Sequence, residues 1–141
     1  MKHRIITIFL ALLMLLCALP VSAEETTAPT TPERAPGYCG EAILWKYEEG
    51  TLTITGTGKM DDFPDGAPWE DHKDDIEKVI ISDMITYVGA YSFCDYDQLT
   101  DVQFGGDVYE IGEQAFFSCD GLTVVHLPAS FKVFGESSFQ S

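Results

Sequence analysis

Acidic residues gather in two clusters in the middle of the chain, and carboxylates are the side chains that bind calcium or exchange protons in a reaction. The clusters consist of Asp61, Asp62, Asp65, Asp71, Asp74 and Asp75. A calcium loop of the EF-hand type needs oxygen ligands at fixed alternate positions around a glycine. The run that ends at Gly66 lacks this spacing, and so does the run of Asp95, Asp97 and Asp101. We interpret these residues as solvated surface and predict no metal site.

Cysteine and histidine supply the other candidates for chemistry. A Cys–His or Ser–His pair needs its groups within hydrogen-bond reach and a third group to orient the base. Cys119 and His126 lie on opposite sides of an expected turn, and His72 lies in the acidic stretch. No metal-ligand spacing of the C-x-x-C or H-E-x-x-H kind and no glycine-rich phosphate loop occurs. We therefore predict no catalytic residue, no cofactor and no enzyme activity.

One sequence pattern occurs three times over residues 78–141, and it predicts the elements that carry Cys94, Cys119 and His126. Val79, Val102 and Val125 occupy equivalent positions, at steps of 23 residues. Other columns with this step are Ile85/Val108/Phe131, Val88/Ile111/Phe134, Gly89/Gly112/Gly135, Ser92/Ala115/Ser138 and Phe93/Phe116/Phe139. A fixed period in the low twenties is typical of a leucine-rich-repeat solenoid. The third copy is incomplete at Ser141.

Each repeat is expected to form a short strand followed by one helical turn. In the middle copy, Val102 and Phe104 alternate with polar or small neighbours, which is the pattern of a half-buried strand. Residues 113–117 are expected to form one helical or 3₁₀ turn. The glycine column suits a backbone with positive φ or one that closely approaches the next coil. The stacked coils would share a core that contains Val79, Ile81, Phe93, Val102, Phe104, Phe116, Val125, Leu127 and Phe139.

The N-terminal segments predict export. Residues 1–23 have the basic start, the apolar run and the small-residue cleavage site of a secretory signal peptide. Cys17 follows Leu16, a poor match to a lipoprotein signal, so a lipid anchor is the disfavoured alternative. Residues 24–37 are rich in threonine and proline and are expected to form an extended linker.

Charge narrows the choice of partner. Cleavage removes Lys2 and Arg4 and leaves six basic and 23 acidic residues, a formal net charge of 6 − 23 = −17. Such a chain repels phosphates, so we expect no nucleic-acid binding. We also expect no membrane insertion after the signal peptide is cleaved. Solubility outside the cell is the favoured explanation of the charge, and a cationic partner is the alternative.

Three cysteines remain after cleavage, Cys39, Cys94 and Cys119, an odd number that excludes complete pairing within the chain. Cys94 and Cys119 lie one repeat plus two residues apart, so stacking would bring them near each other. A bridge needs Cα atoms about 4.4–6.8 Å apart. We favour two buried thiols in the repeat core and keep a Cys94–Cys119 disulfide as the alternative.

Residues 38–77 are expected to cap the first repeat. Residues 43–47 and 51–55 read as two strands of a β-hairpin around Gly50. An acidic loop and a short helix within residues 69–77 would then lead into the first repeat strand. A solenoid needs such a terminal element to cover its first coil.

The repeats resemble the BspA-type leucine-rich repeat. The resemblance rests on the run from Val79 to Phe93, on the run from Ala115 to Thr123 with its Cys119 and Leu122, and on Leu127-Pro128. The pattern from Cys39 to Gly58, with Pro68-Trp69, is similar to the N-terminal cap of such proteins. It implies an α/β, β-rich solenoid with a hairpin cap. It also implies a secreted or surface-displayed bacterial protein that acts in adhesion or protein binding and has no shared catalytic residues.

The strand residues that flank the inward pair are the candidate binding face. They are Lys78, Ile80, Asp101, Gln103, Val124 and His126. We predict a non-enzymatic module, extracellular or on the cell surface, that binds an extracellular protein or glycan through this face. An alternative is an accessory or truncated repeat segment of a larger secreted enzyme. The third copy lacks a polar terminal cap, so edge-to-edge contact at that end is also expected.

Overall fold

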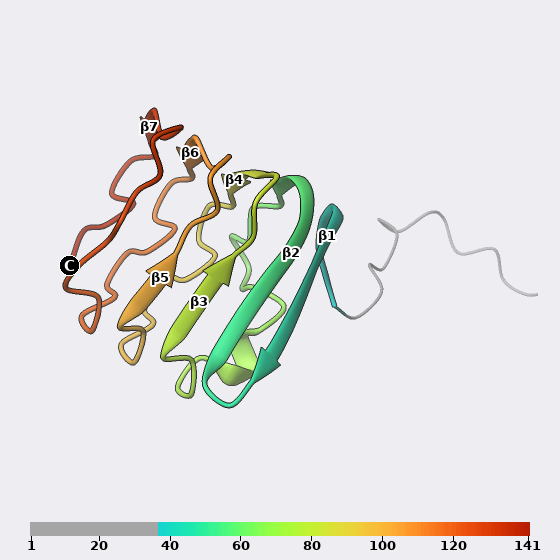
Figure 1. Cartoon of the computed structure of the whole chain (residues 1–141). Helices are drawn as coiled ribbons and strands as arrows, with labels where there is room; N and C mark the ends of the chain where they lie inside the picture. Colours follow the sequence, from blue (N-terminus) through green and yellow to red (C-terminus); the bar gives the residue numbers. More distant parts are fainter. Residues whose placement is uncertain (1–36) are drawn as a thin grey trace, which may run out of the picture. The chain divides into compact units, whose positions relative to one another are not determined.

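The computed structural model describes residues 37–141, and these residues form a stack of coils built almost entirely from strands and turns (Figure 1). The predicted signal peptide and all of the predicted linker except Gly37 lie outside the described residues. In the described part, no helix is long and apolar enough to cross a membrane. The elements are β1 (Tyr38–Glu48), β2 (Thr51–Met60), the 3₁₀ helix η1 (Glu70–His72), β3 (Lys78–Ile81), β4 (Ile85–Val88), β5 (Asp101–Gln103), β6 (Glu110–Ile111) and β7 (Val133–Phe134).

Two parallel ladders share strand β2. The first half of β2 pairs with β3, β3 pairs with β5, and an isolated bridge from Gln103 to His126 extends this ladder, which we call sheet A. The second half of β2 pairs with β4, followed by β6 and β7, and we call this ladder sheet B. Strand β1 pairs antiparallel with β2 as the expected hairpin. The predicted solenoid with its hairpin cap is therefore confirmed.

Equivalent side chains lie one above the other. Leu52 is in register with Val79, and Val79 with Val102. The bridge from Gln103 to His126 continues this register by another 23 residues. Leu52, Val79 and Val102 are at most 3% exposed, so the column is part of the core. The period read from the sequence is thus the register of the parallel strands.

Four stacked aromatic rings run through the core. The ring centroids of Trp69 and Phe93 are 5.4 Å apart, and those of Phe93 and Phe116 and of Phe116 and Phe139 are each 5.0 Å apart. The interplanar angles are 22°, 14° and 6°, so all three contacts are stacked. Trp69 Nε1 donates a hydrogen bond of 3.1 Å to the Ser92 carbonyl. The cap thus supplies the first ring of the aromatic column.

The glycine column exists because neighbouring coils approach too closely for a side chain. A Cβ on Gly112 would lie 2.5 Å from the Ala90 nitrogen, and one on Gly135 would lie 2.3 Å from the Glu113 nitrogen. Real Cβ contacts are not this short, so a side chain would push the coils apart. None of Gly89, Gly112 and Gly135 has positive φ. Close approach, not backbone conformation, therefore selects glycine.

The prediction of a helical or 3₁₀ turn over residues 113–117 is wrong. These residues form successive turns, because Gln114 and Ser118 adopt the left-handed conformation, with φ of 48° and 56°. A right-handed helix cannot continue through such residues. The equivalent positions Tyr91 and Asp95 have φ of 60° and 61°. The left-handed residues therefore recur with the period of the repeat.

Most of the predicted core is buried. Val79, Ile81, Phe93, Val102 and Phe116 are at most 3% exposed, whereas Phe104 and Phe139 are partly buried against the core. Val125 is only half-buried, and the core prediction for Leu127 is wrong, since it is 39% exposed. Both residues lie on the last described coil, which has another coil on one side only.

The aromatic column yields the first test. Phe116 is 1% exposed and stacked on both sides, whereas Phe139 is stacked on Phe116 and partly exposed. We expect Phe116→Ala to lower the free energy of unfolding in urea by about 3–5 kcal/mol. Phe139→Ala, the matched control on the last coil, should cost less than half as much. Equal losses for both variants, or a loss below about 1 kcal/mol for Phe116→Ala, would contradict stacking as the source of stability.

Candidate functional site

The six residues of the predicted binding face lie together on the outer surface of sheet A. Lys78 is in register with Asp101, and Ile80 with Gln103, which is bridged to His126. Val124 is 60% exposed, and Gln103 and His126 are also exposed. Because side chains alternate along a strand, these residues point away from the buried valine column. The structure thus forms two rows of side chains across neighbouring strands.

Charges on this face are paired with each other. Lys78 Nζ lies 2.9 Å from Asp101 Oδ2, and Gln103 Nε2 donates a hydrogen bond of 3.4 Å to the same oxygen. The pairing holds three side chains of adjacent strands in one arrangement. A partner would therefore meet a surface that is partly ordered before binding.

The hairpin extends both rows, and the sequence reasoning missed this. Lys46 is in register with Thr53 and Thr53 with Ile80, while Glu48 is in register with Thr51 and Thr51 with Lys78. Lys46 Nζ and Glu48 Oε1 form an ion pair of 2.6 Å. In the sequence, Thr51 and Thr53 alternate with the apolar residues Leu52 and Ile54, and this alternation was the available signal for a solvated face. We call the combined surface the strand face; it consists of Lys46, Glu48, Thr51, Thr53, Lys78, Ile80, Asp101, Gln103, Val124 and His126.

The strand face is balanced in charge on an otherwise acidic protein. Of the 23 acidic residues, Glu24, Glu25 and Glu33 precede residue 37, which leaves 23 − 3 = 20 in the described part. Only Glu48 and Asp101 belong to the strand face, and each forms an ion pair with a lysine of the same face. The excess negative charge therefore lies on other surfaces.

Asp62, an acidic residue of the cap, has a structural role because it accepts hydrogen bonds from the first repeat. Asp62 Oδ1 accepts hydrogen bonds from the Tyr87 hydroxyl, at 2.7 Å, and from the Ala90 nitrogen, at 2.8 Å. Burial and the nearby Asp62 carboxylate raise the pKa of Tyr87 well above its usual range. Within residues 37–141, no group of three or more histidine, cysteine or acidic side chains is arranged to hold a metal ion.

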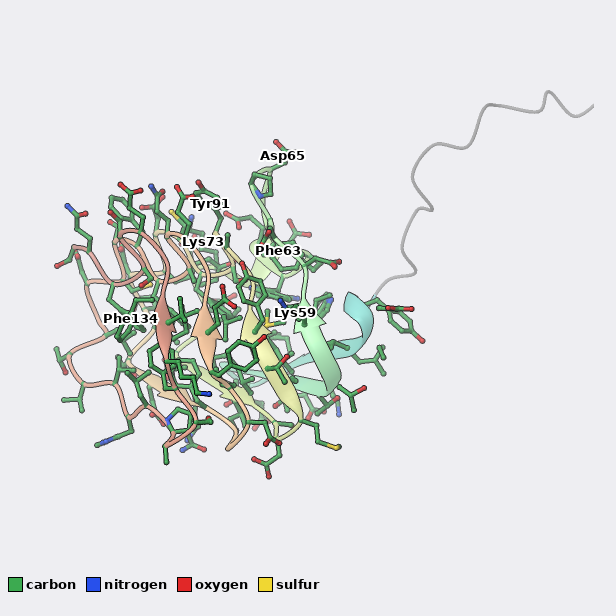
Figure 2. All side chains as sticks on the ribbon, turned by 90° about the horizontal axis from the view of Figure 1, so that it is seen from above. Lys59, Phe63, Asp65, Lys73, Tyr91 and Phe134 are labelled. Carbon is green, nitrogen blue, oxygen red and sulfur yellow. The ribbon has the colours of Figure 1, made fainter. Side chains whose placement is uncertain are left out.

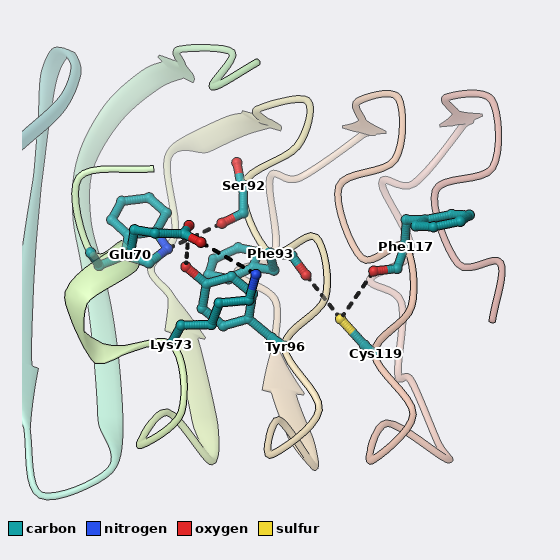
Figure 3. A network of polar contacts seen from close by, with 8 residues as sticks. Glu70, Lys73, Ser92, Phe93, Tyr96, Phe117 and Cys119 are labelled. Carbon is teal, nitrogen blue, oxygen red and sulfur yellow. Dashed lines mark hydrogen bonds and ion pairs between the residues drawn. The ribbon is translucent and has the colours of Figure 1, made fainter. Parts of the chain in front are cut away.

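Cys94 and Cys119 are free thiols, so the disulfide kept as an alternative is absent from the structure. Cys119 is 6% exposed and its Sγ donates a hydrogen bond of 3.0 Å to the Phe93 carbonyl (Figure 3). Burial raises the pKa of Cys119 to about 11. Burial, together with Asp95, also raises the pKa of Cys94. Both shifts favour the unreactive protonated thiol.

Tyr96 occupies the column of Cys119 in the preceding coil. Its ring is fully buried, and its hydroxyl lies 3.4 Å from Glu70 Oε2. Lys73 Nζ lies 3.2 Å from Glu70 Oε1 and 5.4 Å from the centre of the Tyr96 ring (Figure 3). Burial and Glu70 raise the pKa of Tyr96 above its usual range. This network fastens η1 to the first repeat, which gives it a structural role.

Within residues 37–141, Cys119 and His126 lie in different environments. His126 is exposed on the strand face, whereas Cys119 is buried inside the coil. His72 stacks on Tyr47 with ring centroids 4.2 Å apart, beside the hairpin. The described residues thus do not assemble the Cys–His pair considered from the sequence.

The last coil leaves an apolar surface at the end of the stack away from Lys59 (Figure 2). Phe134 is 55% exposed, whereas its column neighbours Val88 and Ile111 are fully buried. A cavity of about 410 Å³ opens here. Its lining is about equally polar and apolar and consists of Phe116, Cys119, Asp120, Leu122, Thr123, Val125, Leu127, Phe134, Phe139 and Ser141.

Known proteins share this architecture. A leucine-rich repeat protein from Eubacterium ventriosum has 29% sequence identity and a TM-score of 0.65, over 72% of this chain and 28% of that one. A leucine-rich repeat protein of T. pallidum, at 14% identity and a TM-score of 0.52 over 69% of this chain and 52% of that one, is similar in fold. The chain thus spans about a quarter and a half of the length of these relatives. Comparison with curated proteins gives no match.

The family model for the BspA type leucine-rich repeat region (6 copies) matches residues 71–141, half of the chain. The match covers the coils whose strands, glycine column and aromatic column are described above. The chain therefore belongs to the BspA-type leucine-rich repeat family.

Proposed function

We propose that the chain is a secreted or surface-displayed, non-enzymatic module that binds an extracellular protein or glycan through the strand face. Repeat proteins of this family are generally protein-binding modules without enzyme activity. The observation that carries the assignment to the strand face is its balance of charge. The centres of protein interfaces are depleted of charged residues, and the two carboxylates of the strand face, Glu48 and Asp101, are each paired with a lysine.

Export is part of the proposal. The pattern of residues 1–23 supports a signal peptide, and proteins of this family are typically on the bacterial surface or secreted. The alternative is that the chain acts as an accessory or truncated repeat segment of a larger secreted enzyme. The greater length of the solved relatives is consistent with that alternative. Reading the gene beyond the codon for Ser141 would decide between the two.

The strand face is tested by a double substitution that keeps the net charge. Gln103→Arg with His126→Glu replaces two exposed side chains in the row beside Ile80. We expect binding to immobilised extracellular-matrix proteins or glycans to weaken at least tenfold, since central interface contacts carry most of the affinity. Surface plasmon resonance would measure the change.

A matched control makes this test specific. Gln98→Arg with Ala129→Glu introduces the same charges at exposed positions that are not on the strand face. This variant should bind within twofold of the original protein. If the face variant also binds within twofold, the strand face is not the binding site.

The non-enzymatic assignment is tested through Cys119. At pH 8, a thiol of pKa about 11 is ionised about 100-fold less than one at its ordinary value of 9.0, and only the thiolate reacts readily. We expect iodoacetamide to label Cys119 at least 100-fold more slowly in the folded chain than in urea, as followed by peptide mass spectrometry. Rapid labelling of Cys119 in the folded chain would indicate an activated nucleophile instead.

For a chain that ends at Ser141, we propose that the last coil makes the expected edge-to-edge contact with a second copy of the chain. Phe131 and Phe134 of the last coil occupy columns that hold aliphatic residues in the earlier coils. Aromatic residues are enriched at protein interfaces, so these two residues are suited to such a contact. Phe134→Glu should abolish dimers in light scattering and lower the binding of an apolar dye. Val133→Glu, at a neighbouring residue, is the control. A chain that is monomeric and binds no dye would contradict this contact.

A further inference from the structure

Two acidic rims border the strand face. At the starts of the strands, the start rim consists of the exposed residues Glu49, Asp75 and Glu77. The Glu77 nitrogen donates a hydrogen bond of 2.9 Å to the Gly50 carbonyl, which places Glu77 beside the hairpin turn (Figure 1). At the ends of the strands, the end rim consists of Asp83 and Asp107, which follow β3 and β5.

The end-rim carboxylates are held in place by backbone donors. Asp83 Oδ1 accepts a hydrogen bond of 2.7 Å from the Gly106 nitrogen, and Asp107 Oδ2 accepts one of 2.9 Å from the Met84 nitrogen. The two turns are thus linked to each other from coil to coil. Both aspartates are exposed, so the second oxygen of each carboxylate can accept a further hydrogen bond.

The rims carry uncompensated charge. The ion pairs of the described residues involve Glu48, Glu70 and Asp101, and none includes a rim carboxylate. Between the rims, the row that contains Lys46, Thr53, Ile80, Gln103 and His126 has no acidic residue, and both carboxylates of the other row, Glu48 and Asp101, are paired with lysines. A strand face without unpaired charge thus lies between two negative borders.

We propose that the partner of the strand face is a protein surface with a neutral or apolar centre flanked by lysine or arginine. This inference rests on the proposed function and specifies its partner. The centre provides contact area without unpaired charge, and the rims attract cationic side chains and orient the partner as it approaches. An acidic glycan or protein is repelled by both rims, and a neutral glycan gains nothing from them.

The partner chemistry can be tested by selecting binders from a displayed library of random peptides on the immobilised chain. Clones that also bind the Gln103→Arg/His126→Glu variant are removed by counter-selection. We expect the remaining peptides to carry lysine or arginine on both sides of an apolar segment. Enrichment of neutral or acidic peptides would overturn the proposed partner chemistry.

The rims are then tested on the selected peptides by surface plasmon resonance at low salt. Glu49→Gln/Asp75→Asn/Glu77→Gln removes three negative charges from the start rim, and we expect it to lower the association rate constant about tenfold. The control Glu110→Gln/Glu113→Gln/Glu136→Gln removes three charges on and beside sheet B and should change the rate less than twofold. Equal effects of the two variants would mean that only the total charge matters and would overturn the inference.

The outcomes separate this inference from the proposed function. If no clone survives the counter-selection, so that every peptide binds equally to the strand-face variant, the proposed function fails. If peptides depend on the strand face but are not basic, or ignore the start rim, only the partner chemistry fails. Circular dichroism of each variant should match that of the original chain, which shows that loss of binding is not loss of fold.

Discussion

The structure depends on one constraint, the close stacking of equivalent residues in successive coils. The aromatic rings of Phe93, Phe116 and Phe139 lie 5.0 Å from their neighbours, and the glycine column lets the backbones approach until no Cβ would fit. These two features need each other, because a bulkier residue at Gly112 would separate the coils and unstack the rings. Stability therefore comes from contacts between neighbours, as in other repeat proteins.

This arrangement is the reason that the proposed function is assigned to the outside of the coil. The inward positions of sheet A are taken up by the core, and Cys119 and Tyr96 lie in the interior, where burial keeps their side chains protonated. The outward positions are free to vary without disturbing the stack. The strand face is one such surface, with ordered ion pairs, a neutral centre and acidic borders. In the proposed function, recognition is therefore a property of several coils together and not of one residue.

Much of the fold could be predicted because the repeat period equals the strand register, so that Val79 and Val102 align as expected. The turn at Gln114 could not, because left-handed residues other than glycine leave no clear mark in a sequence. The contribution of Lys46 and Thr53 to the strand face was missed for another reason. The hairpin joins the ladder through the pairing of Leu52 with Val79, a separation of 27 residues that the 23-residue period does not reveal.

The same pairing has a consequence for how such proteins evolve. Duplication or loss of a whole 23-residue unit keeps every column in step, so unequal recombination can lengthen or shorten the array without redesigning it. The junction between the hairpin and the first unit obeys a different spacing, and Trp69, the first ring of the aromatic column, precedes Phe93 by 93 − 69 = 24 residues instead of 23. Variation in copy number is therefore compatible with the fold only downstream of this junction, while the hairpin is inherited as a single piece.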